Sequence, residues 1–384
     1  MFKLWKNCDL YAPEHIGICD ILVFGDKIYK IGPDLSAWSS CGDTETLDLS
    51  GMKVCPGLVD MHIHVTGGGG EQGPASRTPE IKTGELITNG VTTLMGLLGT
   101  DGISRSLENL LFKCKALEQF GFTVKMLTGN YHYPSPTLTG SVSRDISLID
   151  PIVGVKIAVS DHRSSNIGWK ELVDLGSQAR AGGMISGKKG VVIMHMGDGR
   201  DGLAPLFSAL ENSELPPSTF IPTHCSRSSG LAEQAVEFNK LGGTIDFTAD
   251  AINDEHESSE AVFTALAQGA DPSRITISSD SCGSIPVFDE NGSCVSITYS
   301  TPSSMLRELN YLASAKKVPM ETALRFFTQN PADVLGLGAS KGKICPGADA
   351  DIIALNSSWS VEYLMMRGSL CISQGQVMRK GNFE

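Results

Sequence analysis

Residues 58–64, LVDMHIH, decide the fold of this chain. The run is short and mostly apolar, which predicts a buried β-strand. Side chains alternate between the two faces of a strand, so His62 and His64 lie on the same face. Two imidazoles that face one interior can share a metal ion. An H-x-H pair alone is weak evidence, because alternating polar residues are common on strands, and the other strand ends must be considered with it.

Seven further apolar segments follow at intervals of roughly thirty residues, the length of one βα unit. They are residues 92–97, 123–128, 152–158, 190–195, 219–224, 243–248 and 275–280. Helical patterns lie between most of them, for example at residues 104–120, 169–184, 230–241 and 258–268. Apolar strands that alternate with amphipathic helices indicate an α/β fold with a parallel sheet. Eight units favour a closed (β/α)8 TIM barrel over an open doubly wound sheet.

Both ends of the chain have a different, β-rich pattern. Residues 17–32 predict two strands joined at Gly25-Asp26, and residues 45–55 add a third β-like stretch. The pattern returns near the C-terminus at residues 350–355, 361–367 and 370–377. We therefore expect a small β-sandwich domain built from residues 1–55 and 340–384. Residues 56–339 would then form the catalytic barrel.

The composition excludes several classes of protein. The 384 residues are 41% apolar and 19% charged, which is enough apolar material for a large core. A net charge of -12 argues against a nucleic-acid partner, although a local pair of arginines can still bind carboxylates. The ten cysteines contain no C-x-x-C pair, as expected for reduced thiols. No apolar run approaches the ~20 residues that span a bilayer, and early charges argue against a secretory signal. We expect a cytoplasmic protein without a membrane partner.

The C-terminal ends of barrel strands carry the active site in enzymes of this fold. His195 and His224 end the fifth and sixth predicted strands, and Asp280 ends the eighth. Each of them alone is more simply a polar residue at the point where a strand leaves the core. Together with His62 and His64 they supply imidazoles and a carboxylate, the ligand set for Zn²⁺ or a similar first-row metal ion.

Lys156 lies within the fourth apolar strand, residues 152–158, where an unpaired ammonium group is costly. One interpretation is that it reaches the strand end to pair with an acidic residue such as Asp161. The other is that burial lowers its pKa, so that the neutral amine reacts with CO₂. The resulting carbamate carries a negative charge and two oxygens that can bridge two metal ions. The neighbouring histidines favour the second interpretation.

The pattern of ligands along the strands resembles the binuclear metal-dependent amidohydrolase superfamily. Within it, the chain resembles the isoaspartyl (β-aspartyl) dipeptidase family over nearly its whole length. The most specific stretches are PGLVDMHIH (56–64), GGGGE (67–71), GLLGTD (96–101), LTGNYH (127–132), SDHRS (160–164), HMGD (195–198), PTHCSR (222–227) and SSD (278–280).

The resemblance implies two Zn²⁺ ions per subunit, bridged by carboxylated Lys156 and a hydroxide. The implied metal ligands are His62, His64, Lys156, His195, His224 and Asp280. In the implied reaction the bridging hydroxide attacks the isopeptide bond of a β-aspartyl dipeptide. Asp280 takes the proton of the hydroxide and passes it to the leaving amine.

The resemblance also implies a substrate pocket. Its residues are Glu71 for the α-amino group, Arg163 and Arg227 for the carboxylates, Tyr131 for the developing oxyanion, and Thr100 and Ser284 along the wall. A β-aspartyl dipeptide carries one ammonium and two carboxylates, so one acidic and two arginine side chains match its charges.

Some questions stay open in the sequence. Residues 250–257 are more acidic than the family pattern, which leaves the preference for the leaving group in doubt. Alternative functions are another amidohydrolase, such as a dihydroorotase-like enzyme or an N-acyl amino acid deacylase, and a non-catalytic barrel scaffold. Retention of all six metal ligands disfavours the scaffold. The resemblance further implies a homo-oligomer, such as an octamer. The identity of the native metal stays open.

Overall fold

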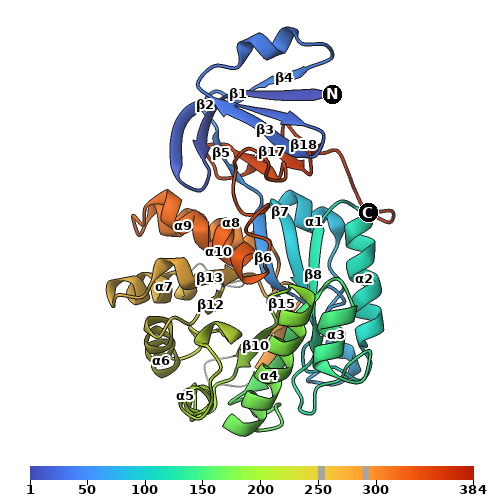
Figure 1. Ribbon diagram of the computed structural model, residues 1–384, viewed down its shortest axis with the longest axis vertical. Coiled ribbons are helices and arrows are strands. Elements are labelled where there is room, and N and C mark those ends of the chain that lie inside the picture. Colours follow the sequence, from blue (N-terminus) through green and yellow to red (C-terminus); the bar gives the residue numbers. More distant parts are fainter. Residues whose placement is uncertain (250–255, 289–293) are drawn as a thin grey trace.

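The computed structural model of the chain describes residues 1–249, 256–288 and 294–384. In Figure 1, strands from both ends of the chain form the upper layer, and a larger α/β part lies below them. The cores of the two parts consist largely of separate groups of buried side chains.

All eight strands predicted for the middle of the chain are present. They are β6 (Leu58–Ile63), β7 (Val91–Gly96), β8 (Thr123–Gly129), β9 (Ile152–Val159), β10 (Val191–Met196), β11 (Phe220–Thr223), β12 (Ile245–Thr248) and β13 (Ile275–Ser278). The first six form one sheet in chain order, β12 pairs with β13, and each of these pairings is parallel. The prediction of a parallel α/β sheet is confirmed.

The edges of the curled sheet meet through β12 and β13. The backbone N–H of His64 donates to the carbonyl of Ser281 at 2.9 Å, and that of Cys225 donates to Asp246 at 3.2 Å. These bonds join β6 to the segment after β13, and the end of β11 to β12. The strands thus form a curled parallel sheet, an arrangement that is consistent with a (β/α)8 barrel.

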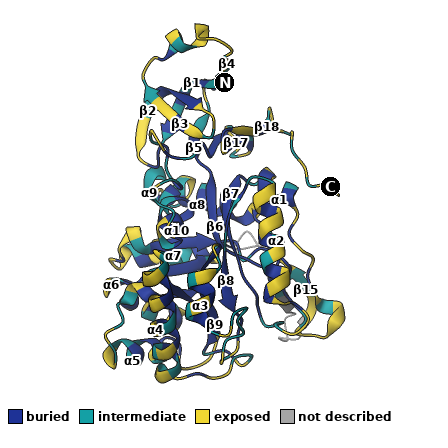
Figure 2. Cartoon of the chain, turned by 45° about the vertical axis from the view of Figure 1, so that its right-hand side comes forward, coloured by how far each residue is buried: buried dark blue, intermediate teal, exposed yellow. Residues whose placement is uncertain are grey.

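Helices cover the outside of the sheet. Their bounds are α1 (Thr83–Thr88), α2 (Leu107–Gln119), α3 (Val142–Leu148), α4 (Trp169–Ser186), α5 (Ala204–Glu211), α6 (Ser229–Lys240), α7 (Glu257–Ala267), α8 (Ser303–Ser314), α9 (Met320–Phe327) and α10 (Gln329–Val334). The hydroxyls of Ser106, Ser141 and Ser228 accept a backbone N–H at the start of α2, α3 and α6, so each of these helices begins at a serine cap. Figure 2 shows the strands dark with burial and the outer sides of the helices exposed.

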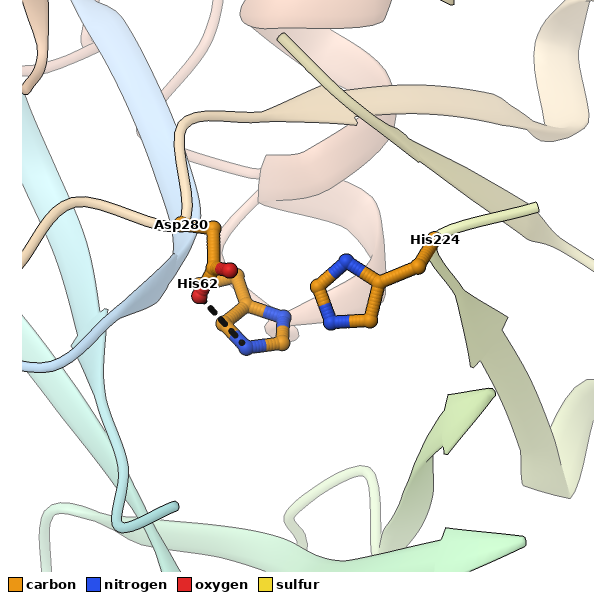
Figure 3. Close-up of side chains that lie close together, drawn as sticks. All are labelled: His62, His224 and Asp280. Atoms are coloured by element: carbon orange, nitrogen blue, oxygen red, sulfur yellow. Dashed lines mark ion pairs between the residues drawn. The ribbon is translucent and has the colours of Figure 1, made fainter. Parts of the chain in front are cut away.

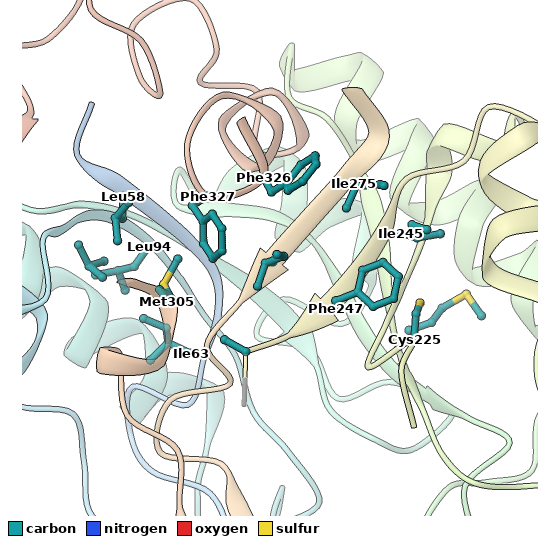
Figure 4. Close-up of a cluster of buried hydrophobic side chains, with 14 of the residues drawn as sticks. Leu58, Ile63, Leu94, Cys225, Ile245, Phe247, Ile275, Met305, Phe326 and Phe327 are labelled. Atoms are coloured by element: carbon teal, nitrogen blue, oxygen red, sulfur yellow. The ribbon is translucent and has the colours of Figure 1, made fainter. Parts of the chain in front are cut away.

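Aromatic side chains fill the seam between the first and last barrel strands. Phe326 and Phe327 of α9 are fully buried, and they lie in one apolar cluster with Leu58 of β6 and Ile275 of β13 (Figure 4). Helices α9 and α10 both contact β6 and β13. This packing holds the strand that carries His62 beside the one that leads to Asp280.

Short elements connect these units. They are the 3-10 helices η1 (Ser36–Ser40), η2 (Pro74–Ser76), η3 (Pro217–Thr219) and η4 (Pro272–Arg274), and the antiparallel strands β14 (Ser284–Phe288) and β15 (Cys294–Tyr299). The β14–β15 pair follows the last barrel strand and was not predicted from the sequence.

The strands of both termini share one sheet. It contains β1 (Phe2–Tyr11), β2 (His15–Phe24), β3 (Lys27–Gly32), β4 (Glu45–Asp48), β5 (Lys53–Pro56), β16 (Ile352–Leu355), β17 (Val361–Met366), β18 (Ser369–Ser373) and β19 (Gln376–Val377). The two ends meet where β5 pairs antiparallel with β16. The expected sandwich is not confirmed, because these nine strands belong to one hydrogen-bonded sheet.

Two expectations from composition can be compared with the described residues. The nine cysteines whose side chains the structure describes are free. Within the described part of the chain, no helix is both long enough and apolar enough to cross a bilayer.

Candidate metal centre and substrate pocket

The four strand-end histidines form a row inside the barrel. The ring centroids of His62 and His64 are 5.7 Å apart, those of His62 and His224 are 5.1 Å apart, and those of His224 and His195 are 4.5 Å apart. All four side chains are buried. Residues from β6, β10 and β11 therefore meet at one place, although more than 160 residues of sequence separate some of them.

Asp280 completes this group from the segment after β13. Its Oδ1 lies 3.1 Å from Nε2 of His64 and 3.4 Å from Nε2 of His62. One ligand atom each of His62, His224 and Asp280 lies within 4.8 Å of the others, and Figure 3 shows the three side chains facing the same space. Three donor atoms this close can coordinate one cation.

The backbone at two of these strand ends is in the left-handed region. The φ angle is 63° at His224 and 51° at Asp280, a conformation that is uncommon for residues other than glycine. Gly283 leaves room beside the second of them, because a Cβ there would lie 2.8 Å from both carboxylate oxygens of Asp280. Strained backbone of this kind is concentrated at functional sites, where the surrounding fold maintains it.

Lys156 reaches the same interior from β9. Its side chain has no exposed surface, and its Nζ lies 2.9 Å from Nε2 of His62. Burial lowers the pKa of Lys156 to about 7, against the opposing effect of Asp280 and Asp246. None of the hydrogen bonds or ion pairs found among the described residues joins Lys156 to Asp161, the partner that the simpler interpretation named.

The chemistry of these side chains fits a metal ion. Burial lowers the pKa values of His62, His195 and His224 well below 6.5, so these imidazoles are neutral at pH 7. Nε2 of His224 and Oδ1 of Asp280 are buried without a hydrogen-bond partner among the described atoms. Neutral imidazole and carboxylate are the ligand forms of Zn²⁺, and a bound cation would satisfy both atoms.

Four of the residues expected in the substrate pocket lie near His195. Three of them contact its ring, and the fourth, Glu71, contacts Arg163. The hydroxyl of Tyr131 lies 2.6 Å from Nδ1 of His195. Nη2 of Arg163 and Nη1 of Arg227 each lie 3.1 Å from Nε2 of the same ring, and the Tyr131 hydroxyl lies 3.2 Å from it. Nη1 of Arg163 also lies 3.3 Å from Oε1 of Glu71. One acidic and two basic side chains therefore lie next to the histidine row.

Ser284 contacts Glu71, whereas Thr100 follows a glycine that packs against His64. Ser284 donates a hydrogen bond to Oε2 of Glu71 at 3.1 Å. The hydroxyl of Thr100 is buried without a hydrogen-bond partner among the described atoms. Thr100 follows Gly99, where a Cβ would lie 2.8 Å from Cε1 of His64. The absence of a side chain at Gly99 leaves room for that imidazole.

Several known proteins are similar to this chain in sequence or in structure. The amidohydrolase family model matches residues 194–371. The structure is also similar to a crystal structure of a β-aspartyl dipeptidase from Fervidobacterium islandicum AW-1 in complex with β-Asp-Leu, with a TM-score of 0.94 and 42% sequence identity. That similarity covers 100% of this chain and 99% of the other. The chain belongs to the β-aspartyl dipeptidase family. Like the family, it is a hydrolytic enzyme.

Other amidohydrolases are less similar to this chain. A dihydropyrimidinase from Brevibacillus agri NCHU1002 has a TM-score of 0.67 at 16% identity, over 98% of this chain and 96% of the other, and shares the fold. A dihydroorotase from Lactobacillus johnsonii is 36% identical over 99 residues. That match covers 26% of this chain and only 21% of the dihydroorotase, so the β-aspartyl dipeptidase family describes far more of the chain.

Two buried carboxylates that support the site of this β-aspartyl dipeptidase family member were not identified from the sequence. Asp60 accepts hydrogen bonds from the Ser279 hydroxyl and, at 3.2 Å each, from the backbone N–H groups of Ser279 and His62. Asp246 accepts from the hydroxyls of Thr223, Thr276 and Ser278 at 2.6 to 2.7 Å. Burial raises the pKa of Asp60 to about 7 and that of Asp246 to about 6. An acidic residue within an apolar strand is the signal that could have found them.

Asp161 is the third carboxylate that was missed as a site residue. It is buried at the end of β9 and contacts Arg163 and His195. Burial alone would raise its pKa, but the hydrogen bonds from Arg163 and His195 hold the pKa well below the ordinary range. The acidic segment 250–257 cannot be placed in the same way, since its residues 250–255 lie outside the described part of the chain.

Proposed function

We propose that this protein is a binuclear zinc hydrolase that cleaves the isopeptide bond of β-aspartyl dipeptides. The observation that carries the proposal is the contact of Arg163 with both Glu71 and His195, at 3.3 Å and 3.1 Å. This contact would bring a recognition site for one ammonium and two carboxylate groups directly against a cluster of metal-type ligands. The β-Asp-Leu complex of the F. islandicum enzyme, which is 42% identical, supports the same substrate class.

The metal part of the proposal rests on the buried polar cluster. The residues that would hold two Zn²⁺ ions are His62, His64, Lys156, His195, His224 and Asp280. Lys156 would be carboxylated, which its burial and its lowered pKa of about 7 favour because the neutral amine is the form that reacts with CO₂. When bound, such ions acidify a water molecule and polarise a carbonyl group.

The charged residues would orient the substrate. The carboxylate of Glu71 would bind the α-amino group, and Ser284 supports it from the other side. The guanidinium groups of Arg163 and Arg227 would bind the substrate carboxylates, for which their planar donors are suited. Because Glu71 contacts Arg163, and both arginines lie 3.1 Å from Nε2 of His195, the scissile amide would be held near the histidine row.

Two side chains would handle the charge and the proton of the reaction. Burial raises the pKa of Tyr131, so its hydroxyl stays protonated and can donate to the carbonyl oxygen as negative charge develops there. Oδ1 of Asp280 has no hydrogen-bond partner among the described atoms and can accept the proton of the attacking water. Asp280 would then return that proton to the nitrogen of the leaving amine.

The experiment that tests the function combines two measurements on the purified protein. We expect about two zinc ions per subunit by elemental analysis, and turnover of β-Asp-Leu that exceeds turnover of N-acyl amino acids and dihydroorotate. Zinc content near zero after reconstitution would overturn the metal part. A preference for dihydroorotate or for an N-acyl amino acid would assign the chain a different amidohydrolase reaction.

Three further expectations from the sequence are proposals of the same standing. They are a homo-oligomer, a cytoplasmic location, and a division of the chain into a terminal β domain and a catalytic barrel. Light scattering, cell fractionation and limited proteolysis test them in that order.

A further inference from the structure

We propose that Asp161 is a positioning residue that holds Arg163 and the imidazole of His195 in one fixed arrangement. The part that concerns substrate carboxylates rests on the proposed function. The part that concerns the orientation of His195 rests on the geometry of the chain, and its zinc readout rests on the metal part of the proposed function. Through this one carboxylate, the group that binds substrate and the group that faces the metal centre would be coupled.

The contact between Asp161 and Arg163 uses both carboxylate oxygens. Oδ1 accepts from the backbone N–H of Arg163 at 2.8 Å and from Nε at 2.9 Å, and Oδ2 accepts from Nη2 at 2.7 Å. The carboxylate is 1% exposed, whereas the Arg163 side chain is 24% exposed. A two-point contact of this kind fixes the plane of the guanidinium. It leaves Nη1 directed toward Glu71, 3.3 Å away.

The same carboxylate reaches the imidazole of His195. Oδ2 of Asp161 lies 3.1 Å from Nε2 of His195. A carboxylate oxygen can only accept, so in this contact Nε2 carries the ring hydrogen and donates it to Asp161; the Tyr131 hydroxyl lies 2.6 Å from Nδ1 and 3.2 Å from Nε2. Histidines that bind metal ions usually donate their second N–H to such a carboxylate, which fixes the tautomer and the ring orientation. In this tautomer Nδ1 carries no proton, so its lone pair would be the one available to a metal ion.

The negative charge of Asp161 also explains how two guanidinium groups can lie against one imidazole. Nη1 of Arg227 lies 3.8 Å from Oδ2 of Asp161 and donates to the carbonyl of Met196 at 2.9 Å. Asp161 is thus within 4 Å of both arginines. Without this carboxylate, Arg163 and Arg227 would repel each other at the edge of the His195 ring.

The backbone fixes Asp161 independently of these side chains. A Cβ at Gly197 would lie 2.5 Å from both Cα and Cβ of Asp161 and 2.4 Å from the carbonyl oxygen of Ser160. The N–H of Gly199 donates to that carbonyl at 2.8 Å. The turn after β10 therefore packs directly on the turn after β9. Since His195 precedes Gly197 by two residues, the position of Asp161 is tied to the strand end that carries the imidazole.

The test compares Asp161→Asn with a matched control, Asp351→Asn. Asp351 is also a buried carboxylate with one cationic and one backbone partner, Lys341 at 2.6 Å and the N–H of Arg367 at 2.7 Å, but it lies beside the terminal sheet. For Asp161→Asn we expect zinc affinity, measured by competition with a chelator, to fall about tenfold to a hundredfold. We expect KM for β-Asp-Leu to rise about tenfold or more, with kcat changed less. The control should keep both values near those of the wild type, whatever its melting temperature.

The preference for a substrate with a free C-terminal carboxylate is a third measurement. It distinguishes a role of Asp161 in positioning Arg163 from a role in stability alone. The wild type should prefer β-Asp-Leu over its C-terminal amide, because the amide lacks one carboxylate for the arginines. In Asp161→Asn this preference should decrease. If Asp161→Asn does not fold, Asp161→Glu, which keeps the charge but moves it by one methylene group, is measured in the same way.

Two outcomes would overturn the proposal. One is zinc affinity and KM within twofold of the wild type in the Asp161 variant. The other is an equal loss of both in Asp351→Asn. If the wild type does not hydrolyse β-Asp-Leu, the proposed function fails, but the zinc affinity of Asp161→Asn still decides whether Asp161 positions His195.

Discussion

The Nζ atom of Lys156 lies 2.9 Å from Nε2 of His62, and neither side chain is accessible to solvent. Among the described residues, the hydrogen-bond partner of an ammonium group in this position is the imidazole of His62, which is neutral because burial keeps its pKa well below 6.5. Burial therefore favours the neutral amine of Lys156 over the charged ammonium form. This relationship leads directly to the first prediction.

Reconstitution of the metal-free protein should depend on CO₂. Because burial lowers the pKa of Lys156 to about 7, the neutral amine fraction rises about tenfold between pH 6 and pH 8. At a fixed concentration of dissolved CO₂ and saturating Zn²⁺, the rate at which activity returns should rise with pH over this interval. Stopped assays after addition of zinc, with and without bicarbonate, measure that rate.

The matched control for this prediction is Lys188→Ala. Lys188 is partly buried, whereas Lys156 is fully buried, and the Nζ of Lys188 donates to the carbonyls of Ile146, Ile149 and Ile152, away from the histidine row. Lys156→Ala should lose bound zinc and lower kcat by several orders of magnitude, whereas Lys188→Ala should lose only stability. Reconstitution at the same rate without any CO₂ would remove the carbamate from the proposal.

Replacement of Asp280 should lower kcat strongly while the protein still folds. Asp280→Asn keeps the size of the side chain but cannot take up a proton, so we expect kcat to fall about 10²- to 10⁴-fold. Asp271→Asn is the control, because Asp271 lies before the opposite end of β13 and its side chain is 47% exposed. Steady-state kinetics at saturating zinc, together with circular dichroism, give the comparison. A kcat near that of the wild type in Asp280→Asn would exclude Asp280 as the proton carrier.

The strands of the barrel could be predicted from the sequence because the physical signal for them is local. Short apolar runs gave all eight strands, and alternation within β6 placed His62 and His64 on one face. Because parallel strands end at the same edge, the approach of His195, His224 and Asp280 to this pair also follows from the sequence.

The partners of side chains could not be predicted in the same way. Asp161 was considered as a partner of Lys156, yet it contacts Arg163 and His195. The partners of Asp161 depend on how the turns after β9 and β10 pack against each other. Gly197 permits this packing, but the periodicity of apolar residues in the sequence carries no information about it. The terminal strands show the same limit, because alternation indicates which side chains are buried but not whether strands join one sheet or two.

Glu71 should contribute to substrate binding and not to metal binding. Glu71→Gln removes the negative charge that would bind the substrate ammonium group, and a charge-assisted hydrogen bond contributes about 1.5–3 kcal/mol. We therefore expect KM for β-Asp-Leu to rise roughly tenfold to a hundredfold, while the zinc content stays unchanged. Elemental analysis and steady-state kinetics on the same preparation measure both quantities.

The control for Glu71 is Glu80→Gln. Glu80 also forms an ion pair, with Lys113 at 3.1 Å, but its side chain is 49% exposed on the surface. We expect no change in KM for this variant. Parallel loss of zinc and of turnover in Glu71→Gln would instead assign Glu71 a structural role.

The buried carboxylate of Asp60 should make the stability of the metal-free protein depend on pH. Burial raises its pKa from 3.8 to about 7, so the folded state binds this proton more tightly than the unfolded state does. The stabilisation is complete below about pH 4 and is lost as the pH rises through 7. In Asp60→Asn this loss is absent. Between pH 5 and pH 8, the free energy of unfolding of the wild type should therefore fall by roughly 1–4 kcal/mol more than that of Asp60→Asn.

Denaturant unfolding at the two pH values, in the presence of a chelator, measures the change for Asp60. Any constant cost of replacing the carboxylate, such as a weaker bond to Ser279, cancels in the comparison between pH values. Asp145→Asn serves as control, because Asp145 is equally buried but accepts hydrogen bonds from Thr128, Leu138 and Thr139 outside the histidine row.

A bound zinc ion at His62 would stabilise the Asp60 carboxylate through its positive charge. The pH dependence should accordingly shrink when zinc is added, and a pH dependence that is the same in Asp60→Asn and the wild type would show that another group causes it.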